Sequence, residues 1–294
     1  MMKMTTASGH RREVQRRVTG ANGYYTDFEA KKWICEIGRR MYARNYVAAN
    51  DGNITAKVGP NAIWATPTGV SKGFMTPDML VKLDLDGNVL AGRHRPSSEI
   101  KMHLRVYREN PDVRAVVHAH PIVATSYAIA GLELDKALSS EAVVLLGRVP
   151  VAPYALPGSD EVPESIAPYC RDYNAVLLAN HGVLTWGKDL LEAYFRLESL
   201  EHYATMLMYT NEIIKKANEL SCSQVSDLIG IRHRLGIRSG GVPSCRIDGE
   251  TGDAGGRPAS AGREDAEAAK QKLMQEIADR VTEAVLARLS SQAR

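Results

Sequence analysis

Apolar and polar positions along this chain follow two spacings, one typical of strands and one typical of helices. Short apolar runs predict strands at residues 53–58, 62–66, 115–117 and 175–179. Thr26-Asp27-Phe28-Glu29 resembles a capping box and predicts the start of the first helix. Because predicted strands alternate with predicted helices, we expect an α/β fold with a mixed central sheet flanked by helices.

The same spacings predict the remaining elements. Further strands are expected at residues 143–146 and 183–186, and a hairpin with an Asp-Gly tip at 83–90. Further helices are expected from about Ser98 to Glu109 with Ser97 or Ser98 as the cap, from Pro121 to Ala130, between 163 and 175, and over roughly 189–219.

Composition changes towards both ends of the chain. Residues 1–25 are polar with a basic cluster and are expected to form an extension, and residues 26–238 to form one catalytic domain. Residues 239–262 are rich in Gly and Pro and predict a flexible linker. Residues 263–294 predict an amphipathic helix with apolar positions Leu273, Met274, Ile277, Ala278, Val281, Ala284, Val285 and Leu289.

Bulk composition excludes several classes of protein. The 294 residues are 44% hydrophobic and 24% charged with a net charge of +3, so neither nucleic acid nor a membrane surface is an expected partner. There is no apolar run of about 18–20 residues and no secretory signal, which favours a cytoplasmic protein. The cysteines show no Cys-x-x-Cys spacing, so we expect free thiols at Cys35, Cys170, Cys222 and Cys245.

Three histidines follow two of the predicted strands. His118 and His120 are two residues apart after an apolar run, so on a strand both point to the same face. His181 follows the run 175–179 and can supply a third nitrogen. Three protein ligands with one position left open are typical of catalytic zinc, whereas a buried, hydrogen-bonded histidine is the alternative. Glu99 at a predicted helix start strengthens the metal-site interpretation, although taken alone it is better explained as a surface carboxylate favoured by a helix N-terminus.

Three short polar segments offer hydrogen-bond donors suited to a phosphate group. Backbone N–H groups and hydroxyls at turns and helix starts bind phosphate, although these residue types are also common in ordinary turns. The segments therefore matter only if the fold brings them together. They supply the candidate phosphate-binding residues Gly52, Asn53, Thr68, Gly69, Ser97 and Ser98.

The ordered set of these motifs resembles the class II aldolase/adducin family, and especially its L-fuculose-1-phosphate aldolases. The resemblance spans roughly residues 26–220. The motifs that carry it are Gly52-Asn53, Thr66-Pro67-Thr68-Gly69, Ser97-Ser98-Glu99, His118-Ala119-His120, Ala152-Pro153-Tyr154 and Asn180-His181-Gly182.

This resemblance implies a mechanism and an assembly. His118, His120, His181 and Glu99 would hold one Zn²⁺ per subunit, and the three polar segments would bind the phosphate of a ketose 1-phosphate. Substrate would displace Glu99, which would then act as general acid/base at C3 while zinc stabilises an enediolate. The products would be dihydroxyacetone phosphate and a short aldehyde such as lactaldehyde. The enzyme would be a homotetramer with active sites between subunits.

One departure from the family pattern leaves alternatives open. The family aldolase uses a tyrosine to protonate the aldehyde oxygen, but residues 137–142 contain none, and Tyr203 and Tyr209 are the remaining candidates. A pentose-phosphate 4-epimerase is an alternative that resembles this chain but has Asp at the position of Glu99. A sugar-phosphate dehydratase or decarboxylase and a non-catalytic adducin-like module are further alternatives.

The C-terminal segment resembles a second kind of element. A Gly-rich linker followed by the amphipathic helix at 263–294 is similar to the encapsulation peptides of bacterial microcompartment enzymes. An isolated helix of this kind needs a partner that buries its apolar face. The resemblance implies a shell protein or another cargo protein as that partner, and a location inside a microcompartment. Docking on its own domain and coiled-coil self-association are the alternatives.

Overall fold

A single mixed sheet organises the part of the chain described by the computed structural model, residues 23–247. The strand order is β4-β3-β2-β1-β5-β8-β7-β6. All paired neighbours are antiparallel except β6 and β7, so the prediction of a mixed central sheet is confirmed. The strands are β1 (Asn53–Gly59), β2 (Ala62–Ala65), β3 (Val81–Leu83), β4 (Val89–Ala91), β5 (Ala115–Ala119), β6 (Val151–Ala152), β7 (Ala175–Leu178) and β8 (Gly182–Gly187).

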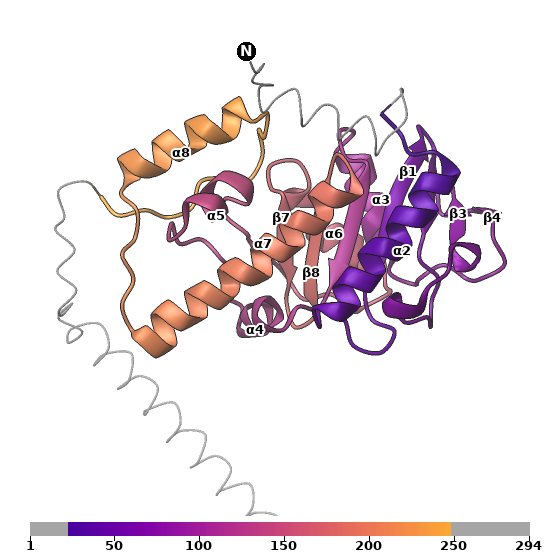
Figure 1. Cartoon of the computed structure of the whole chain (residues 1–294), viewed down its shortest axis with the longest axis horizontal. Coiled ribbons are helices and arrows are strands. Elements are labelled where there is room, and N and C mark those ends of the chain that lie inside the picture. Colours follow the sequence, from indigo (N-terminus) through magenta and orange to yellow (C-terminus); the bar gives the residue numbers. More distant parts are fainter. Residues whose placement is uncertain (1–22, 248–294) are drawn as a thin grey trace, which may run out of the picture. The chain divides into compact units, whose positions relative to one another are not determined.

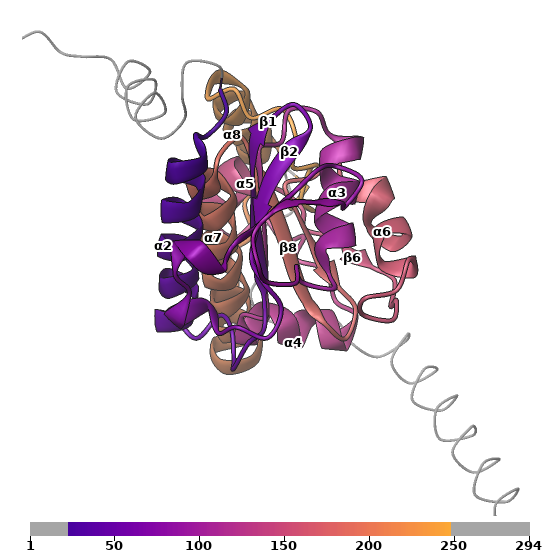
Figure 2. The same ribbon diagram turned by 90° about the vertical axis from the view of Figure 1, so that its right-hand side faces the viewer.

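Helices cover both faces of this sheet. α2 and α7 lie on one face and α3 and α6 on the other (Figures 1 and 2). The α-helices are α2 (Asp27–Ala43), α3 (Ile100–Glu109), α4 (Ile122–Ala130), α5 (Ser140–Leu145), α6 (Glu161–Ile166), α7 (Leu190–Met208) and α8 (Cys222–Arg234). Short helical turns lie at Lys72–Phe74, Pro77–Met79, Ala167–Tyr169 and Tyr209–Ile214. Within the described residues, no helix is both long and apolar enough to cross a membrane.

The sheet separates two apolar cores. Successive residues of a strand point to opposite faces. On β5, Val117 accordingly packs in the core beneath α2 and α7, and Val116 packs in the core beneath α3 and α6. Val116 and Val117 are both fully buried, which explains why the strand appears in the sequence as a continuous apolar run.

The first helix begins as the sequence predicts. The Thr26 hydroxyl accepts from the Glu29 amide at 3.2 Å, and the Glu29 carboxylate accepts from the Thr26 amide at 3.0 Å. This reciprocal pair is a capping box, so two N–H groups that the helix cannot satisfy are bonded.

Three predicted elements are wrong in detail. Residues 143–146, predicted as a strand, belong largely to α5, which Ser139 caps and in which Val143 packs against Val225. Neither Ser97 nor Ser98 caps α3, because Glu99 occupies the cap position and makes no side-chain capping bond. The helix predicted over 189–219 ends at Met208 and is followed by a π-helical turn.

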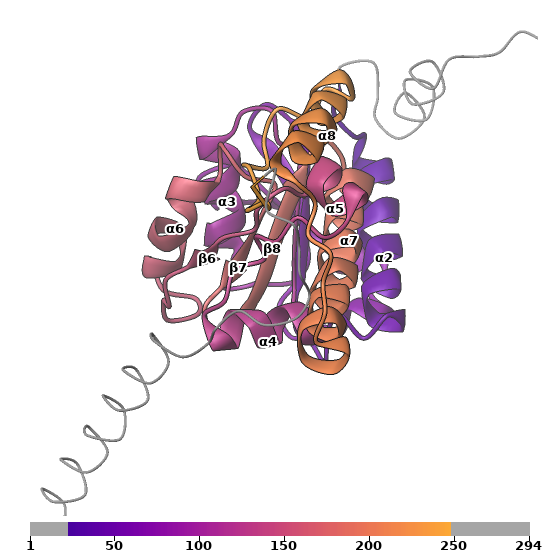
Figure 3. The same ribbon diagram turned by 90° about the vertical axis from the view of Figure 1, so that its left-hand side faces the viewer.

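α8 was not predicted, although its start carries a capping box formed by Ser221 and Gln224. It lies beside α5 (Figure 3). The expectation that all cysteines are free is wrong, because Cys222 at the start of α8 forms a disulfide with Cys245. The chain folds back after α8 and brings together two cysteines that are 23 positions apart, which sequence spacing does not reveal. Cys35 and Cys170 are free, as expected, and both are buried.

The first residues of the expected linker are bonded to the body of the domain. The Ser244 amide donates to the Asp135 carbonyl at 2.6 Å, and the Arg246 amide donates to the Leu220 carbonyl at 3.1 Å. The packed body therefore extends to Ile247. Three expected segments lie wholly or mostly outside the described residues. They are the extension at 1–25, the rest of the linker and the helix at 263–294.

Candidate active site

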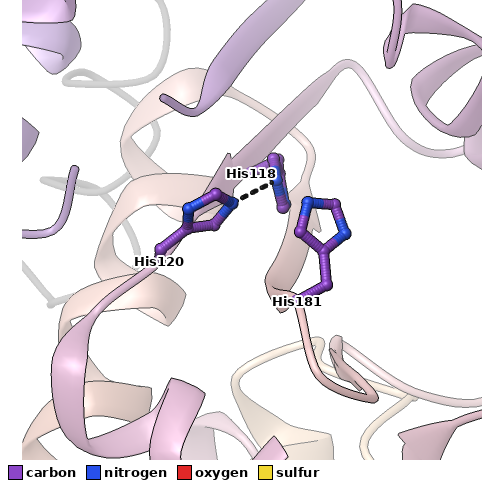
Figure 4. Close-up of side chains that lie close together, drawn as sticks. All are labelled: His118, His120 and His181. Atoms are coloured by element: carbon purple, nitrogen blue, oxygen red, sulfur yellow. Dashed lines mark hydrogen bonds between the residues drawn. The ribbon is translucent and has the colours of Figure 1, made fainter. Parts of the chain in front are cut away.

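The three predicted histidines meet at one end of the central strands (Figure 4). His118 lies on β5, His120 directly follows this strand, and His181 lies in the turn between β7 and β8. One ring nitrogen from each lies within 4.8 Å of the others. The backbone at Gly182 lies so close to the histidines that only glycine fits, since a Cβ there would lie 2.5 Å from the His120 ring.

The free nitrogens of these rings fit a cation. His118 Nδ1 donates to the Val183 carbonyl at 2.9 Å, which leaves Nε2 without a proton in the neutral ring. His120 Nδ1 faces the Asp51 carboxylate at 3.4 Å, and its Nε2 lies 3.0 Å from His118 Nε2. Two bare nitrogens that face each other repel unless a proton or metal ion lies between them. Burial lowers the pKa of both His118 and His120, which favours the neutral form that a metal requires.

Glu99 completes the group. Its carboxylate lies 3.0 Å from His181 Nε2 and 3.5 Å from His118 Nε2. The Asn53 side-chain amide donates to Glu99 Oε2 at 2.7 Å. Burial by itself raises the pKa of Glu99, but His118, His181 and the Asn53 donor together hold this pKa below its usual value. The carboxylate therefore remains ionised as part of a three-nitrogen, one-carboxylate set, which is a donor set suited to zinc.

The predicted phosphate-binding segments form the walls of a cavity beside this group. The cavity has a volume of about 210 Å³, and Glu99, His120 and His181 also line it. Two of its loops are tied together, because the Thr68 amide donates to the Arg95 carbonyl at 3.0 Å. The six predicted residues are all in its lining: Gly52, Asn53, Thr68, Gly69, Ser97 and Ser98.

Two charged residues in the cavity were not predicted as site residues. Lys72 is 1% exposed, and its Nζ donates to the carbonyls of Asn50 at 2.8 Å and Val70 at 2.6 Å. Burial lowers the pKa of Lys72 to about 8, although Asp51 and Glu99 act to raise it. Asp51 also lines the cavity and faces His120. The sequence offers little signal for either, because charged residues beside turn glycines are usually exposed.

The two tyrosines considered for proton transfer lie elsewhere. Tyr203 is buried in the core between α7 and the sheet, and its hydroxyl donates to the Lys136 carbonyl. This contact removes Tyr203 as a candidate proton donor. Tyr209 is 48% exposed at the start of the π-helical turn. Among the described residues that line the cavity there is no tyrosine.

The sequence and structure match one family of proteins. Residues 32–208 match the model of the class II aldolase and adducin N-terminal domain. The chain therefore belongs to the class II aldolase and adducin family.

Individual relatives point to more than one reaction. An L-fuculose phosphate aldolase of Methanocaldococcus jannaschii is 37% identical over 63% of this chain and 99% of its own. A 3-oxo-tetronate 4-phosphate decarboxylase of Haemophilus influenzae is 34% identical over 69% of this chain and 97% of its own. The crystal structure of YgbL from Escherichia coli, a candidate aldolase, epimerase or decarboxylase, matches with a TM-score of 0.65 and 30% identity over 69% of this chain and 98% of that one.

These findings confirm the predicted fold and enzyme class. The relatives are aldolases and decarboxylases, which break carbon–carbon bonds, and this chain is an enzyme of the same lyase class. The alternative of a non-catalytic module is thereby wrong. The relatives differ from one another in the substrate on which they act.

Proposed function

We propose that this chain is a zinc-dependent aldolase that cleaves a ketose 1-phosphate of the L-fuculose 1-phosphate type. The products would be dihydroxyacetone phosphate and a short aldehyde such as lactaldehyde. One observation carries the proposal: the cavity lined by Glu99, His120 and His181, which meet His118, is also lined by the segments whose hydrogen-bond donors suit a phosphate group. The aldolase relative at 37% identity supports the same reaction.

In this proposal His118, His120, His181 and Glu99 hold one Zn²⁺ per subunit. The converging bare nitrogens and the ionised carboxylate are the chemical support for this metal. When bound, zinc supplies Lewis-acid polarisation of the substrate carbonyl, which makes the adjacent carbon–carbon bond easier to break.

The remaining steps belong to side chains of the cavity. Glu99 transfers a proton at C3, because its ionised carboxylate lies 3.0 Å from His181 and lines the cavity together with the phosphate-binding segments. Hydroxyl and N–H groups of the segments around Asn53, Thr68 and Ser97 bind the phosphate and orient the substrate. Lys72 adds the only side-chain ammonium among the described residues that line the cavity, and it holds two of its loops together.

A decarboxylase acting on a sugar-acid phosphate is the second candidate. The Haemophilus influenzae relative favours it, and so does the absence of a tyrosine from the described cavity lining. Loss of carbon dioxide leaves no aldehyde oxygen to protonate, so this reaction does not require that tyrosine. A 4-epimerase is less well supported, because Glu99 stands where the similar epimerases have Asp.

Product analysis separates these candidates. The zinc-loaded chain would be incubated separately with L-fuculose 1-phosphate and with 3-oxo-tetronate 4-phosphate. We expect triose release from the first substrate, measured by a coupled assay for dihydroxyacetone phosphate. Release of carbon dioxide from the second substrate without triose from the first would replace the aldolase by the decarboxylase. Epimerisation of a pentose phosphate, with no triose from the first substrate and no carbon dioxide from the second, would exclude both lyases.

We further propose a homotetramer with active sites between subunits. Large apolar side chains are exposed on and just after α4 and on the turn after α7, and the first of them lies two residues after His120. They are Ile122, Ile129, Leu132, Ile213 and Ile214, which are 56–66% exposed. Exposed apolar side chains of this size favour burial against another copy of the chain. Light scattering should give four times the 32.2 kDa chain mass, and a monomer that retains activity would contradict the proposal.

For residues 263–294 we propose the role of an encapsulation peptide for a microcompartment in the cytoplasm. The support is its predicted amphipathic pattern beyond a Gly-rich linker. Deletion of residues 264–294 should leave lyase activity unchanged and abolish co-purification with microcompartment shells. Normal packaging of the truncated chain would show that the segment has another role.

A further inference from the structure

A buried chain of hydrogen bonds leads from the core to Glu99. Tyr107 OH lies 2.8 Å from Thr55 Oγ1, which lies 2.9 Å from His103 Nδ1. His103 Nε2 is hydrogen-bonded to Asn53 Oδ1, and the other end of that amide donates to Glu99. The four residues behind Glu99 are between 0% and 3% exposed, so no water competes for these contacts.

Two sequence spacings make this chain possible. Glu99, His103 and Tyr107 are four positions apart at the start of α3 and along it, so they share one face of the helix. Asn53 and Thr55 are two positions apart on β1 and share one face of the strand. Four helical residues rise by about 6 Å and two strand residues by about 6.7 Å, so the two rows of side chains alternate in register.

The charge of Glu99 determines which partner donates in every hydrogen bond between Glu99 and Tyr107. A carboxylate only accepts, so Asn53 must turn its NH₂ group towards Glu99 and its oxygen towards His103. His103 Nε2 must then carry a proton. Burial lowers the pKa of His103 to about 3, so the ring is neutral and Nδ1 is bare. Thr55 must therefore donate to Nδ1, and Tyr107 must donate to Thr55.

We propose that His103 is a positioning residue that, as its Nε2-protonated tautomer, fixes the Asn53 amide so that this amide donates to Glu99. The Asn53 amide also lies 3.3 Å from Ser97 Oγ, so the same orientation reaches the phosphate side of the cavity. A flipped amide would direct its oxygen at the Glu99 carboxylate, and repulsion between the two oxygens would displace that carboxylate. The inference rests on the proposed role of Glu99 in proton transfer, but the tautomer itself does not.

The tautomer is measured by nitrogen NMR on the full-length, zinc-loaded chain labelled at its histidines. The signals of His103 are assigned by their loss in His103→Gln. We expect a protonated Nε2 and a bare Nδ1 at neutral pH. A protonated Nδ1, or a doubly protonated ring, would overturn the proposal whether or not the enzyme proves to be an aldolase.

Kinetics test the consequence for the reaction. Loss of both ring nitrogens in His103→Leu should lower kcat about 10- to 100-fold and raise KM by a smaller factor, as for other residues that orient an active-site ligand. His103→Gln keeps a donor for Asn53 and should restore part of this loss. Thr55→Val removes the hydroxyl that donates to His103 Nδ1 and should have a smaller effect on kcat in the same direction.

Thr185→Val is the matched control. Thr185 is a fully buried threonine of the same sheet whose hydroxyl donates to the Ala193 carbonyl at 2.8 Å, outside this chain of bonds. Its loss should reduce stability without lowering kcat. Equal kcat losses in Thr55→Val and Thr185→Val would show that this chain of hydrogen bonds has only a structural role. Unchanged kcat in Thr55→Val would show the same. If His103→Leu fails to fold, Thr55→Val and the tautomer measurement still decide the proposal.

Discussion

The candidate active site and the α8 region are held to the rest of the domain by different means. Around Glu99, buried polar groups bond to one another, and each bond fixes the direction of the next. Beside α8, the apolar cluster contains only three fully buried members, and the fastening comes from the Cys222–Cys245 disulfide and from Arg232. Arg232 Nη1 donates to the Gly241 carbonyl at 2.6 Å, and its Nε donates to Val143 at 3.1 Å.

This difference has a physical reason. A small apolar cluster cannot by itself offset the entropy lost when a helix and a terminal segment are ordered, so a covalent bond and a buried guanidinium complete the attachment. The active site instead requires exact donor and acceptor directions, which a network of hydrogen bonds supplies. We therefore expect changes in the first region to alter chemistry and changes in the second to alter stability.

The largest expected effect follows removal of a metal ligand. His118→Asn should reduce bound zinc to near zero and lower turnover by about 10³-fold or more, since Lewis-acid catalysis contributes several kcal/mol. Zinc content by mass spectrometry and triose release measure both effects. His94→Asn, at an exposed position, is the control and should change neither. Zinc retained at full stoichiometry in His118→Asn would remove this residue from the metal site.

Glu99→Gln should lose about 10²–10⁴-fold in kcat, because an amide cannot transfer the proton. The fold should persist, and the thermal midpoint measures this. Full turnover in this variant would show that Glu99 takes no part in the proton transfer.

Cys222→Ser should affect stability alone. Opening a loop of 23 residues should lower the free energy of unfolding by about 3 kcal/mol, and kcat should stay unchanged. Denaturant unfolding measures the loss. A reductant should cause the same loss in the unmodified chain and none in Cys222→Ser. A fall in kcat with either treatment would show that the two regions are coupled.

Lys72→Met should have the smallest effect, an increase of about 10-fold in KM for a phosphorylated substrate. In the folded chain the pKa of Lys72 is about 8 instead of 10.5, so its ammonium charge is present below pH 8 and lost above it. KM of the unmodified enzyme should therefore rise above pH 8, whereas KM of Lys72→Met should not change there.

The same pKa predicts a change in stability. Between pH 8 and 10.5 the unfolded chain binds a proton at Lys72 that the folded chain does not, so this residue makes stability rise with pH in that window. Lys72→Met should remove the rise, and unfolding curves at both pH values measure it. Lys188→Met, at an exposed position, is the control and should leave KM and stability unchanged.

Local pattern predicted most of the fold. Thr26 and Glu29 signal the first helix because a capping box is satisfied within four residues. The valines at 143 and 144 suggested a strand by intrinsic preference, but capping by Ser139 and packing of Val143 against α8 make them helical. Tertiary contacts of this kind outweigh propensity and are invisible in a short window of sequence.

The sequence alone predicts the histidine pair, because the two-residue period of a strand places His118 and His120 on one side whatever surrounds them. It also determined the order of the polar segments and the apolar strands. Tertiary packing places Lys72 and Asp51 in the cavity, keeps Tyr203 out of it and brings Cys222 to Cys245. It also decided that His103 stands behind Asn53 and Glu99. These relations depend on distances between segments that are far apart in the chain, and such distances are fixed only when the sheet and its two cores pack.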